Sequence, residues 1–317
     1  MQIANIDAPG GWRIAVVDAE FVIDLNRATQ LSLAGSGLLR DSLREEANQE
    51  MPSDIAAWLR LGLTEALERA RRAAARGRAL LAEHGPEWAA AHQLAYPAKD
   101  AVLAPPVAPH ANIMGLGLNY KAHVLEAGRP MPEYPLIFSK PSSALLGPNS
   151  TVTIPKASHR IDYEGELTVV IGRKCKEIPE DAALDYVAGY TLANDVSARD
   201  WQFRTTEIMI GKAFDGFCPI GPWLVTADEI PDPQKVRLET RVNGDLRQDT
   251  LISDMIFSVP RIVSYLSQVM TLEPGDAILT GTPGGIGAAR KPRLWLRPGD
   301  RVDITGTPIG TLTTIMQ

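Results

Sequence analysis

The sequence predicts an α+β protein in two parts, a smaller N-terminal α/β domain over residues 1–108 and a strand-rich body over residues 109–317. Three observations carry this prediction. A long helical pattern is confined to the first hundred residues, a cluster of prolines follows it, and short apolar runs bounded by turn residues dominate afterwards. Because helices and strands do not alternate along the chain, a doubly wound parallel sheet is not expected.

The N-terminal part begins with strands and continues with a helix. Residues 12–25 are rich in apolar β-formers and predict two short strands around a turn at residues 18–20. From residue 54 to about 83 apolar residues recur at helical spacing, with Ser53 or Asp54 as the N-cap. The arginines of this helix predict a solvated face without a functional role. The boundary near residue 108 follows from the prolines that end the pattern, Pro97, Pro105, Pro106 and Pro109.

The body is predicted to consist mainly of strands. A Pro-Gly-Asp turn at 274–276 and again at 298–300 begins two of them, since proline presets φ and glycine accepts the left-handed region. One further helix is expected around residues 253–270. The predicted strands cover residues 167–172, 187–193, 223–226, 236–242, 277–280 and 301–305.

Composition and charge exclude several classes of function. The chain has 317 residues, is 45% hydrophobic and 22% charged, and carries 38 acidic against 32 basic side chains, so it resembles a globular protein and not a nucleic-acid partner. No apolar run is long enough for a membrane span, and the first residues lack the order of a signal peptide. Cys175 and Cys218 form no C-x-x-C pattern, so we expect neither a disulfide nor a zinc site. We expect the protein to be located in the cytoplasm.

Two glycine-rich segments do not meet the requirements of nucleotide loops. Gly115-Leu116-Gly117 lacks the third glycine of a dinucleotide fingerprint and follows a proline-rich linker. The segment 284–287 has no following Lys-Ser/Thr, so it predicts a tight turn between strands. The G-x-S-x-G and H-E-x-x-H patterns are absent from the sequence, which excludes the common serine hydrolases and zincins.

Three carboxylates stand where strands begin or end. Glu164 and Glu166 precede the apolar run 167–171 at i, i+2, so strand alternation places them on one face, where like charges require a cation or a proton. A solvated strand end is the alternative. Asp195 follows the strand 187–193, and a helical turn beginning there would align it with Arg199 and Gln202, either as a ligand site or as a plain Asp195-Arg199 ion pair.

The residue types of this group indicate a metal and a base. Three oxygen ligands without thiolate or imidazole favour a hard cation, Mg²⁺ or Mn²⁺, that would act as a Lewis acid. His123 and Glu126 lie three residues apart, so Glu126 can hold one ring nitrogen while the other faces a water, the arrangement of a general base. A lone histidine would be more typical of a structural role.

These residues lie in motifs that resemble the fumarylacetoacetate hydrolase superfamily. The motifs occur in the family's order and extend over roughly residues 110–317. They are Gly117-Leu118-Asn119-Tyr120 with His123 and Glu126, Phe138-Ser139-Lys140-Pro141, Asp162-Tyr163-Glu164-Gly165-Glu166-Leu167, Asn194-Asp195 through Gln202, Gly211-Lys212-Ala213-Phe214-Asp215, Val242-Asn243-Gly244 and Gly281-Thr282-Pro283-Gly284-Gly285. The first 108 residues resemble the variable N-terminal domain of bacterial members.

The resemblance implies a fold of strongly bent mixed sheets and a β-roll around one divalent cation, in a homodimer. By motif position it assigns Glu164, Glu166 and Asp195 to the metal, His123 and Glu126 to water activation, and Lys212 to polarising or protonating the reacting centre. It places four further residues against the substrate, Tyr120, Arg199, Gln202 and Thr282. Two positions depart from the pattern, since Asn119 replaces a carboxylate and Gly216 replaces a common Thr or Ser.

The implied activity is hydrolysis of the C–C bond of a 2,4-dioxo acid, of the acylpyruvate or fumarylpyruvate type, in aromatic or sugar-acid catabolism. A water activated by His123 and Glu126 would attack the C4 carbonyl, and cleavage of the C3–C4 bond would release pyruvate as its enolate, with Lys212 and Gln202 donating to the oxyanion. An isomerase or decarboxylase of the 2-hydroxymuconate or oxaloacetate type, acting through the same enolate, is the alternative. A binding module without catalysis would have no use for a base and a proton donor beside one cation.

Overall fold

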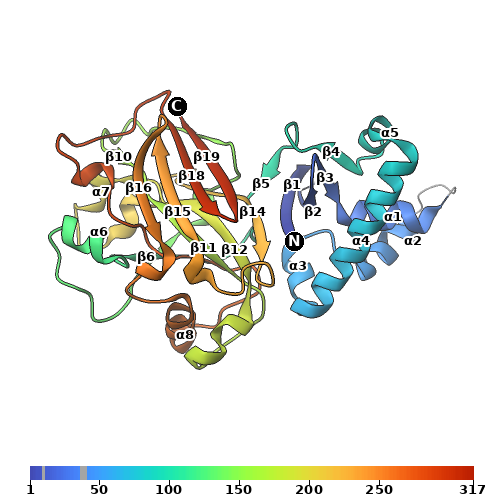
Figure 1. Cartoon of the computed structure of the whole chain (residues 1–317), viewed down its shortest axis with the longest axis horizontal. Helices are drawn as coiled ribbons and strands as arrows, with labels where there is room; N and C mark the ends of the chain where they lie inside the picture. The colour runs from blue at the N-terminus through green and yellow to red at the C-terminus, as the bar shows by residue number, and fades with distance from the viewer. Residues whose placement is uncertain (9–10, 36–40) are drawn as a thin grey trace.

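The computed structural model describes residues 1–8, 11–35 and 41–317. The first hundred residues, blue to teal in Figure 1, lie beside a body of curved sheets formed by the rest of the chain. Both sheets of the body contain parallel and antiparallel pairs, so the predicted mixed α+β class is confirmed. The boundary at residue 108 stays a prediction.

The N-terminal segment begins with a meander of strands. β1 (Gln2–Ala8), β2 (Gly11–Asp18) and β3 (Phe21–Asp24) pair antiparallel in order, so the predicted strands and the turn between them are confirmed. Two short strands follow the helices, β4 (Ala95–Pro97) against β3 and β5 (Leu103–Ala104) against β1. The helices are α1 (Leu25–Ala34), α2 (Asp41–Glu50), α3 (Ile55–Leu59), α4 (Leu63–His84) and α5 (Pro86–Ala91).

The helix predicted over residues 54–83 is two helices. Asp54 caps α3 as expected, because its side chain accepts a hydrogen bond from the Ala57 amide. The break falls at Gly62, whose φ of 85° lies in the left-handed region and cannot continue a helix. The buried Trp58 indole bridges the break by donating to the Ala66 carbonyl at 2.6 Å. The single-helix prediction was therefore wrong at one turn, although both pieces keep the predicted apolar face.

A single sheet runs from the N-terminal segment into the body. Its strand order is β4-β3-β2-β1-β14-β12-β11-β17-β6-β7, with β5 beside β1 and β8 beside β14. The junction is the antiparallel pair of β1 and β14, in which Ile3 lies opposite Leu224. The new strands are β6 (Ile113–Gly117), β7 (Leu136–Lys140), β8 (Leu145–Leu146), β11 (Gly165–Ile171), β12 (Val187–Asn194), β14 (Cys218–Thr226) and β17 (Ala277–Leu279).

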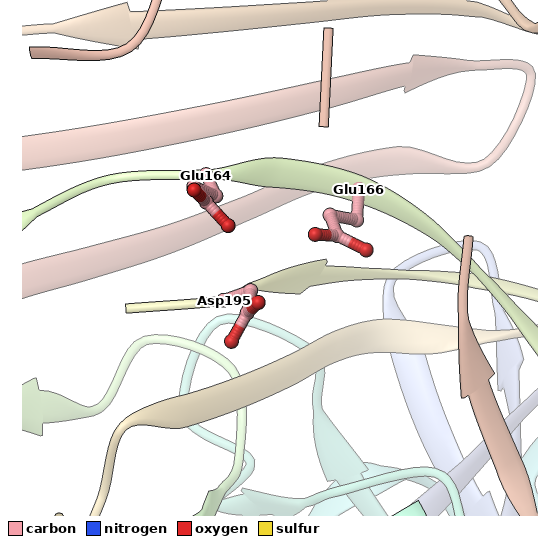
Figure 2. A group of neighbouring side chains, drawn as sticks. All are labelled: Glu164, Glu166 and Asp195. Carbon is pink, nitrogen blue, oxygen red and sulfur yellow. The ribbon is translucent and has the colours of Figure 1, made fainter. Parts of the chain in front are cut away.

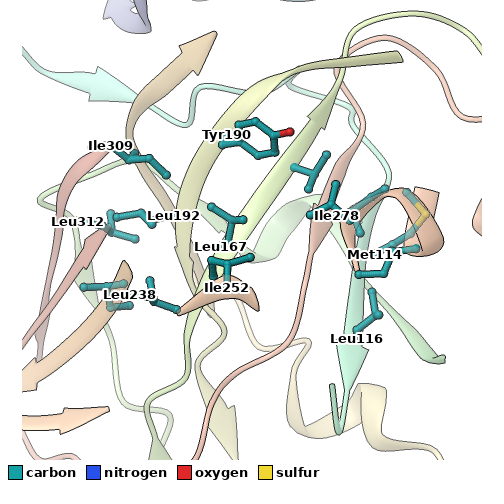
Figure 3. Close-up of a cluster of buried hydrophobic side chains, with 14 of the residues drawn as sticks. Met114, Leu116, Leu167, Tyr190, Leu192, Leu238, Ile252, Ile278, Ile309 and Leu312 are labelled. Carbon is teal, nitrogen blue, oxygen red and sulfur yellow. The ribbon is translucent and has the colours of Figure 1, made fainter. Parts of the chain in front are cut away.

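A second sheet of order β16-β15-β18-β19-β9 covers one face of β11 and β12. Along β11, Leu167 and Val169 enter the core between the two sheets, while Val170 packs into the core of the N-terminal helices. Figure 3 shows the first of these cores, where Leu167, Tyr190 and Leu312 meet. β11 and β12 are thus buried on both faces. The second sheet contains β9 (Thr151–Val152), β15 (Arg237–Val242), β16 (Asp245–Leu251), β18 (Arg301–Thr307) and β19 (Gly310–Met316).

Short elements complete the body. β10 (Ile161–Asp162) pairs with β13 (Ser197–Ala198), and α6 (Lys121–Glu126) and α7 (Arg199–Gln202) follow strand ends. The helix predicted around 253–270 begins later, as α8 (Val259–Val269), because Ser258 caps it and a proline occupies its first turn. The 3₁₀ turns are η1 (Ser142–Ala144), η2 (Glu180–Tyr186), η3 (Ile208–Gly211), η4 (Pro233–Lys235), η5 (Ile252–Asp254) and η6 (Gly287–Ala289).

Within the described ranges, no helix has the length and apolar character required to cross a membrane.

We expect a fragment of residues 109–317 to unfold at a lower temperature than the whole chain. Its β14 would lose β1 as a partner, and Ile220 and Leu224 would lose the apolar cover of the N-terminal helices. Exposing one such side chain costs about 1.5–3 kcal/mol. Circular dichroism melting of both proteins tests this, and equal melting temperatures would instead support a body that folds without the first 108 residues.

Candidate metal centre

Two neighbouring strands bring the three predicted carboxylates together. β11 and β12 are antiparallel with Gly165 opposite Asn194, so the start of one strand lies beside the end of the other. The Asp195 amide donates to the Glu164 carbonyl at 2.8 Å and fixes this corner. One carboxylate oxygen from each of Glu164, Glu166 and Asp195 lies within 4.8 Å of the others, and all three side chains are buried. Figure 2 shows them gathered at the adjoining strand ends.

The helical turn predicted from Asp195 to Gln202 is wrong. Asp195 is followed by the extended strand β13, which pairs with β10, and α7 begins only at Arg199. Arg199 therefore pairs with carboxylates other than Asp195. Its Nε donates to Asp162 Oδ2 at 2.9 Å, and a terminal nitrogen donates to Glu164 Oε1 at 2.5 Å. Its second terminal nitrogen donates to Gln202 Oε1 at 2.8 Å, so the predicted neighbours Arg199 and Gln202 do lie together.

Two buried lysines contact the same carboxylates. Lys212 Nζ lies 2.5 Å from Glu164 Oε2 and 2.5 Å from Asp195 Oδ2. Lys140 Nζ, from the end of β7, donates to Asp195 Oδ1 at 2.5 Å. Burial alone would raise the pKa of Glu164, but Arg199 and Lys212 outweigh it and hold that pKa below its usual value. Burial likewise opposes the charge of Lys212, yet Asp195 and Glu164 raise the pKa of its ammonium.

Of the three carboxylates, Glu166 is the one that forms no ion pair with a described residue. Its Oε2 accepts from the Gly281 amide at 2.6 Å, while its Oε1 is buried and has no hydrogen-bond partner among the described residues. Burial, and then the charges of Asp195 and Glu164, raise the pKa of Glu166 well above its ordinary value. An unpartnered buried oxygen beside two other carboxylates fits a divalent cation that takes oxygen ligands. Glu164, Glu166 and Asp195 are the residues suited to hold it.

The predicted histidine and glutamate form a pair on α6. His123 Nδ1 lies 2.9 Å from Glu126 Oε1, and Glu126 Oε2 accepts from the Gly285 amide at 2.8 Å. Glu126 is thus held in place and leaves His123 Nε2 for a water or a substrate. One loop relates the pair to the carboxylates, since its Gly281 amide donates to Glu166 and its Gly285 amide donates to Glu126. The segment 284–287, predicted as a tight turn between strands, belongs to a longer loop that runs from the end of β17 to η6, and its Gly285 amide contacts this pair.

An open groove of about 660 Å³ adjoins the pair, between Tyr120 and Glu126 on one side and Asp254 on the other. Tyr120 is almost fully buried, and its hydroxyl has no hydrogen-bond partner in the part of the chain that the structure describes. Burial first, and then the charges of Glu166 and Asp254, raise the pKa of Tyr120. Tyr120 therefore stands between the carboxylate cluster and the groove, as a substrate contact would.

Thr282, the last predicted substrate contact, is engaged with the protein. Its hydroxyl donates to the Gly165 carbonyl at 3.1 Å and accepts from Gln248 Nε2 at 2.7 Å. Gln248, from β16, also accepts from the Gly165 amide at 3.0 Å and so ties β11 to the loop after β17. The Asn119 side chain hydrogen-bonds to the backbone of Phe257 and Thr280 and so connects three segments of the chain.

Sequence reasoning missed three residues of the site. Asp162 accepts a hydrogen bond from Arg199. Because it lies two positions before Glu164 in the same motif, strand alternation could have predicted that both side chains lie on one face. Lys140 lies in one of the family motifs, but the resemblance assigned no role to it. Gln248 lies in no motif that would predict a place in the site. Each contacts a predicted site residue from an element that is distant in the sequence.

Comparisons with known proteins agree with this geometry. The family model described as fumarylacetoacetate (FAA) hydrolase C-terminal matches residues 112–317. A protein of Burkholderia cenocepacia, whose name assigns it provisionally to the hydrolases, is 51% identical over 191 residues, which are 60% of this chain and 68% of that protein. The mitochondrial oxaloacetate tautomerase of Xenopus laevis is 44% identical over 210 residues, 66% of each chain.

Solved structures share the architecture over the whole chain. One is a maleylpyruvate hydrolase from a Sphingobium species, in complex with manganese (II) ion and pyruvate. It is 29% identical, with a TM-score of 0.70 over 100% of this chain and 98% of the other. The similarity therefore extends through the N-terminal segment as well as the residues that the family model matches.

We expect Glu166→Gln to stabilise the metal-free protein at neutral pH. The pKa of Glu166 is raised in the folded state, so its contribution to stability is present below the unfolded-state pKa and is lost as the pH rises through the folded-state pKa. The neutral amide of glutamine does not ionise, so the variant avoids this loss of stability. In melting experiments with EDTA, the melting temperature of the variant should exceed that of the wild type by a margin that grows with pH, at about 2–4 °C for each kcal/mol of stability gained.

Glu87→Gln, at an exposed helical position, is the matched control and should change nothing. A Glu166→Gln protein that melts below the wild type across the whole pH range in EDTA would contradict the raised pKa.

Proposed function

The chain belongs to the fumarylacetoacetate hydrolase family, and on that premise we propose that it is a metal-dependent hydrolase that cleaves the C–C bond of a 2,4-dioxo acid. The substrate would be of the acylpyruvate or fumarylpyruvate type. The single observation that supports the proposal is that one loop, through its Gly281 and Gly285 amides, holds both Glu166, which has an unpartnered buried oxygen among the described residues, and the Glu126 of the His123-Glu126 pair.

The cation, Mg²⁺ or Mn²⁺, would be held by Glu164, Glu166 and Asp195 and would supply Lewis-acid stabilisation of negative charge on the oxo acid. The charges around it suit an anionic substrate. Four buried carboxylates face three buried cations, so a divalent ion leaves the cluster with one positive charge, which a monoanionic carboxylate would neutralise. The members are Asp162, Glu164, Glu166, Asp195, Lys140, Arg199 and Lys212.

The protein's own residues would perform the proton transfers. His123 Nε2 takes a proton from a water, while Glu126 holds Nδ1 and stabilises the imidazolium that forms. The hydroxide adds to the C4 carbonyl, and the electrons of the C3–C4 bond pass to C3 as the tetrahedral adduct collapses. C3 then takes up a proton, so that one water and one 2,4-dioxo acid yield one carboxylic acid and one pyruvate.

Four residues would bind the substrate. Arg199 has five N–H donors, and its hydrogen bonds to Asp162, Gln202 and Glu164 use three, which leaves two for a carboxylate. Gln202 Oε1 already accepts from Arg199, so its amide nitrogen is the atom left to donate to the oxyanion at C4. Lys212 can turn one of its three N–H donors to the same oxygen. Tyr120 lines the groove, and its hydroxyl, which is buried and has no partner among the described residues, would contact a bound substrate.

We expect His123→Ala to lower kcat for acylpyruvate hydrolysis about 10²- to 10⁴-fold, because the general base is lost. His110→Ala, at an exposed loop position, is the control and should keep the wild-type rate. The assay follows pyruvate and acid release from acylpyruvates and fumarylpyruvate, with and without EDTA. Full activity of His123→Ala would show that His123 is not the general base. Full activity in EDTA would show that the reaction needs no metal ion.

A second candidate is the keto-enol tautomerisation of oxaloacetate, favoured by the 44% identity to the Xenopus laevis tautomerase. This reaction moves a proton between C3 and an oxygen and adds no water. If it is the main activity, the protein should accelerate the decay of enol oxaloacetate while releasing no acid from acylpyruvates. Parallel assays on both substrates distinguish the two candidates, and oxaloacetate decarboxylation is scored in the same experiment as pyruvate formation.

The homodimer, the cytoplasmic location and the choice between Mg²⁺ and Mn²⁺ stay predictions. Light scattering on the purified protein measures the first, and titration with each cation measures the last.

A further inference from the structure

Strand β7 directs two side chains into the site that the proposed mechanism does not use. Phe138 and Lys140 are two residues apart and therefore share one face of the strand, whereas Ser139 between them is exposed and contacts Met209 on the outside. Lys140 contacts the Asp195 carboxylate, and the Phe138 ring centre lies 5.3 Å from Lys212 Nζ. One face of β7 thus contacts both members of the Lys212-Asp195 ion pair.

The contact of Lys140 is fully desolvated. The side chains of Lys140 and Asp195 are both completely inaccessible to solvent, and the distance from Nζ to Oδ1 is 2.5 Å. Burying an ammonium group costs several kcal/mol unless a close partner compensates it, so this position requires a reason other than packing. Its effect is geometric as well as electrostatic. With Oδ1 bonded to Lys140 and Oδ2 bonded to Lys212, the Asp195 carboxylate has one orientation.

A glycine makes room for this arrangement. Gly115, in β6, lies opposite Phe138 in the antiparallel pair, and a Cβ atom there would come within 2.3 Å of the Phe138 ring. The Gly115-Leu116-Gly117 segment, which fails as a nucleotide loop, therefore has a local physical purpose. The missing Cβ at Gly115 leaves room for the far end of the Phe138 ring against β6, on the face of β7 that also carries Lys140.

We propose that Lys140 is a positioning residue for the metal centre, which fixes the orientation of the Asp195 carboxylate through which a divalent cation would be bound. This inference rests on the proposed function in one respect, namely that Glu164, Glu166 and Asp195 bind such a cation. Groups that hydrogen-bond a metal ligand from outside typically contribute about 10- to 100-fold to metal affinity.

The test is the affinity of the whole chain for Mn²⁺ alone, measured by calorimetry without substrate. Lys140→Met keeps the length and apolar stem of the side chain but removes the donor. We expect its Mn²⁺ affinity to fall about 10- to 100-fold. We also expect its electron paramagnetic resonance spectrum to broaden, because Asp195 would no longer hold one orientation. Lys156→Met, at an exposed lysine, is the matched control and should bind as the wild type does.

A double-mutant cycle shows whether Lys140 acts through Asp195. Asp195→Asn should weaken Mn²⁺ binding by itself, and adding Lys140→Met should then have little further effect, because the group that Lys140 orients is already altered. If the two losses add in full, Lys140 acts independently of Asp195 and the inference is overturned. Lys140→Gln, which keeps a donor without the charge, should recover part of the affinity and serves if Lys140→Met does not fold.

The outcomes separate this inference from the proposed function. Unchanged or tighter Mn²⁺ binding in a folded Lys140→Met protein would mean that Lys140 only offsets charge, and would overturn the positioning role alone. A wild-type chain that binds neither Mn²⁺ nor Mg²⁺ would overturn the metal centre itself, and the inference with it.

Discussion

The site depends on one constraint, that four carboxylates buried at adjoining strand ends require positive charge around them. Buried carboxylates are not stabilised by solvent water, so cationic side chains from segments far apart in the sequence must neutralise them. The end of β7 contributes Lys140, the short helix α7 contributes Arg199, and the turn after η3 contributes Lys212. The remaining carboxylate, Glu166, has one oxygen without a partner among the described residues and a raised pKa. The need for a further cation follows from that imbalance.

The fold meets this constraint by burying β11 and β12 on both faces. The second sheet covers one face, and the core beneath the N-terminal helices covers the other. Because this pair of strands is held on two sides, the backbone hydrogen bond between Glu164 and Asp195 fixes where the two residues lie, and the lysines then orient the Asp195 carboxylate. The relatives that this chain resembles include both a maleylpyruvate hydrolase and an oxaloacetate tautomerase, so one rigid cluster of this kind is compatible with more than one reaction. Under the proposed function, the His123-Glu126 pair would add a base for water.

The elements predicted from the sequence were those with a strong local signal. The strand pair before residue 25, the apolar strands of the body and the capped helix α3 obey turn and capping rules that act over a few residues. The two errors have different causes. Gly62 breaks the long helix through its own left-handed φ, a local feature, whereas β13 stays extended because a segment distant in the sequence, β10, pairs with it. β1 and β19, which the sequence did not predict, are defined by their partner strands.

By itself the sequence determined the chemistry available to the protein. The residue types at 123, 126, 164, 166 and 195 and the order of their motifs identify the family and a hard-cation site, because ligand preference and acid-base character are properties of single side chains. Only the tertiary structure decided which charges face each other. Arg199 pairs with Asp162 and Glu164 in place of Asp195, and Lys140 reaches Asp195 across 55 positions of the chain. Coulomb energies depend on distances in space, which strand pairing fixes and spacing along the sequence does not.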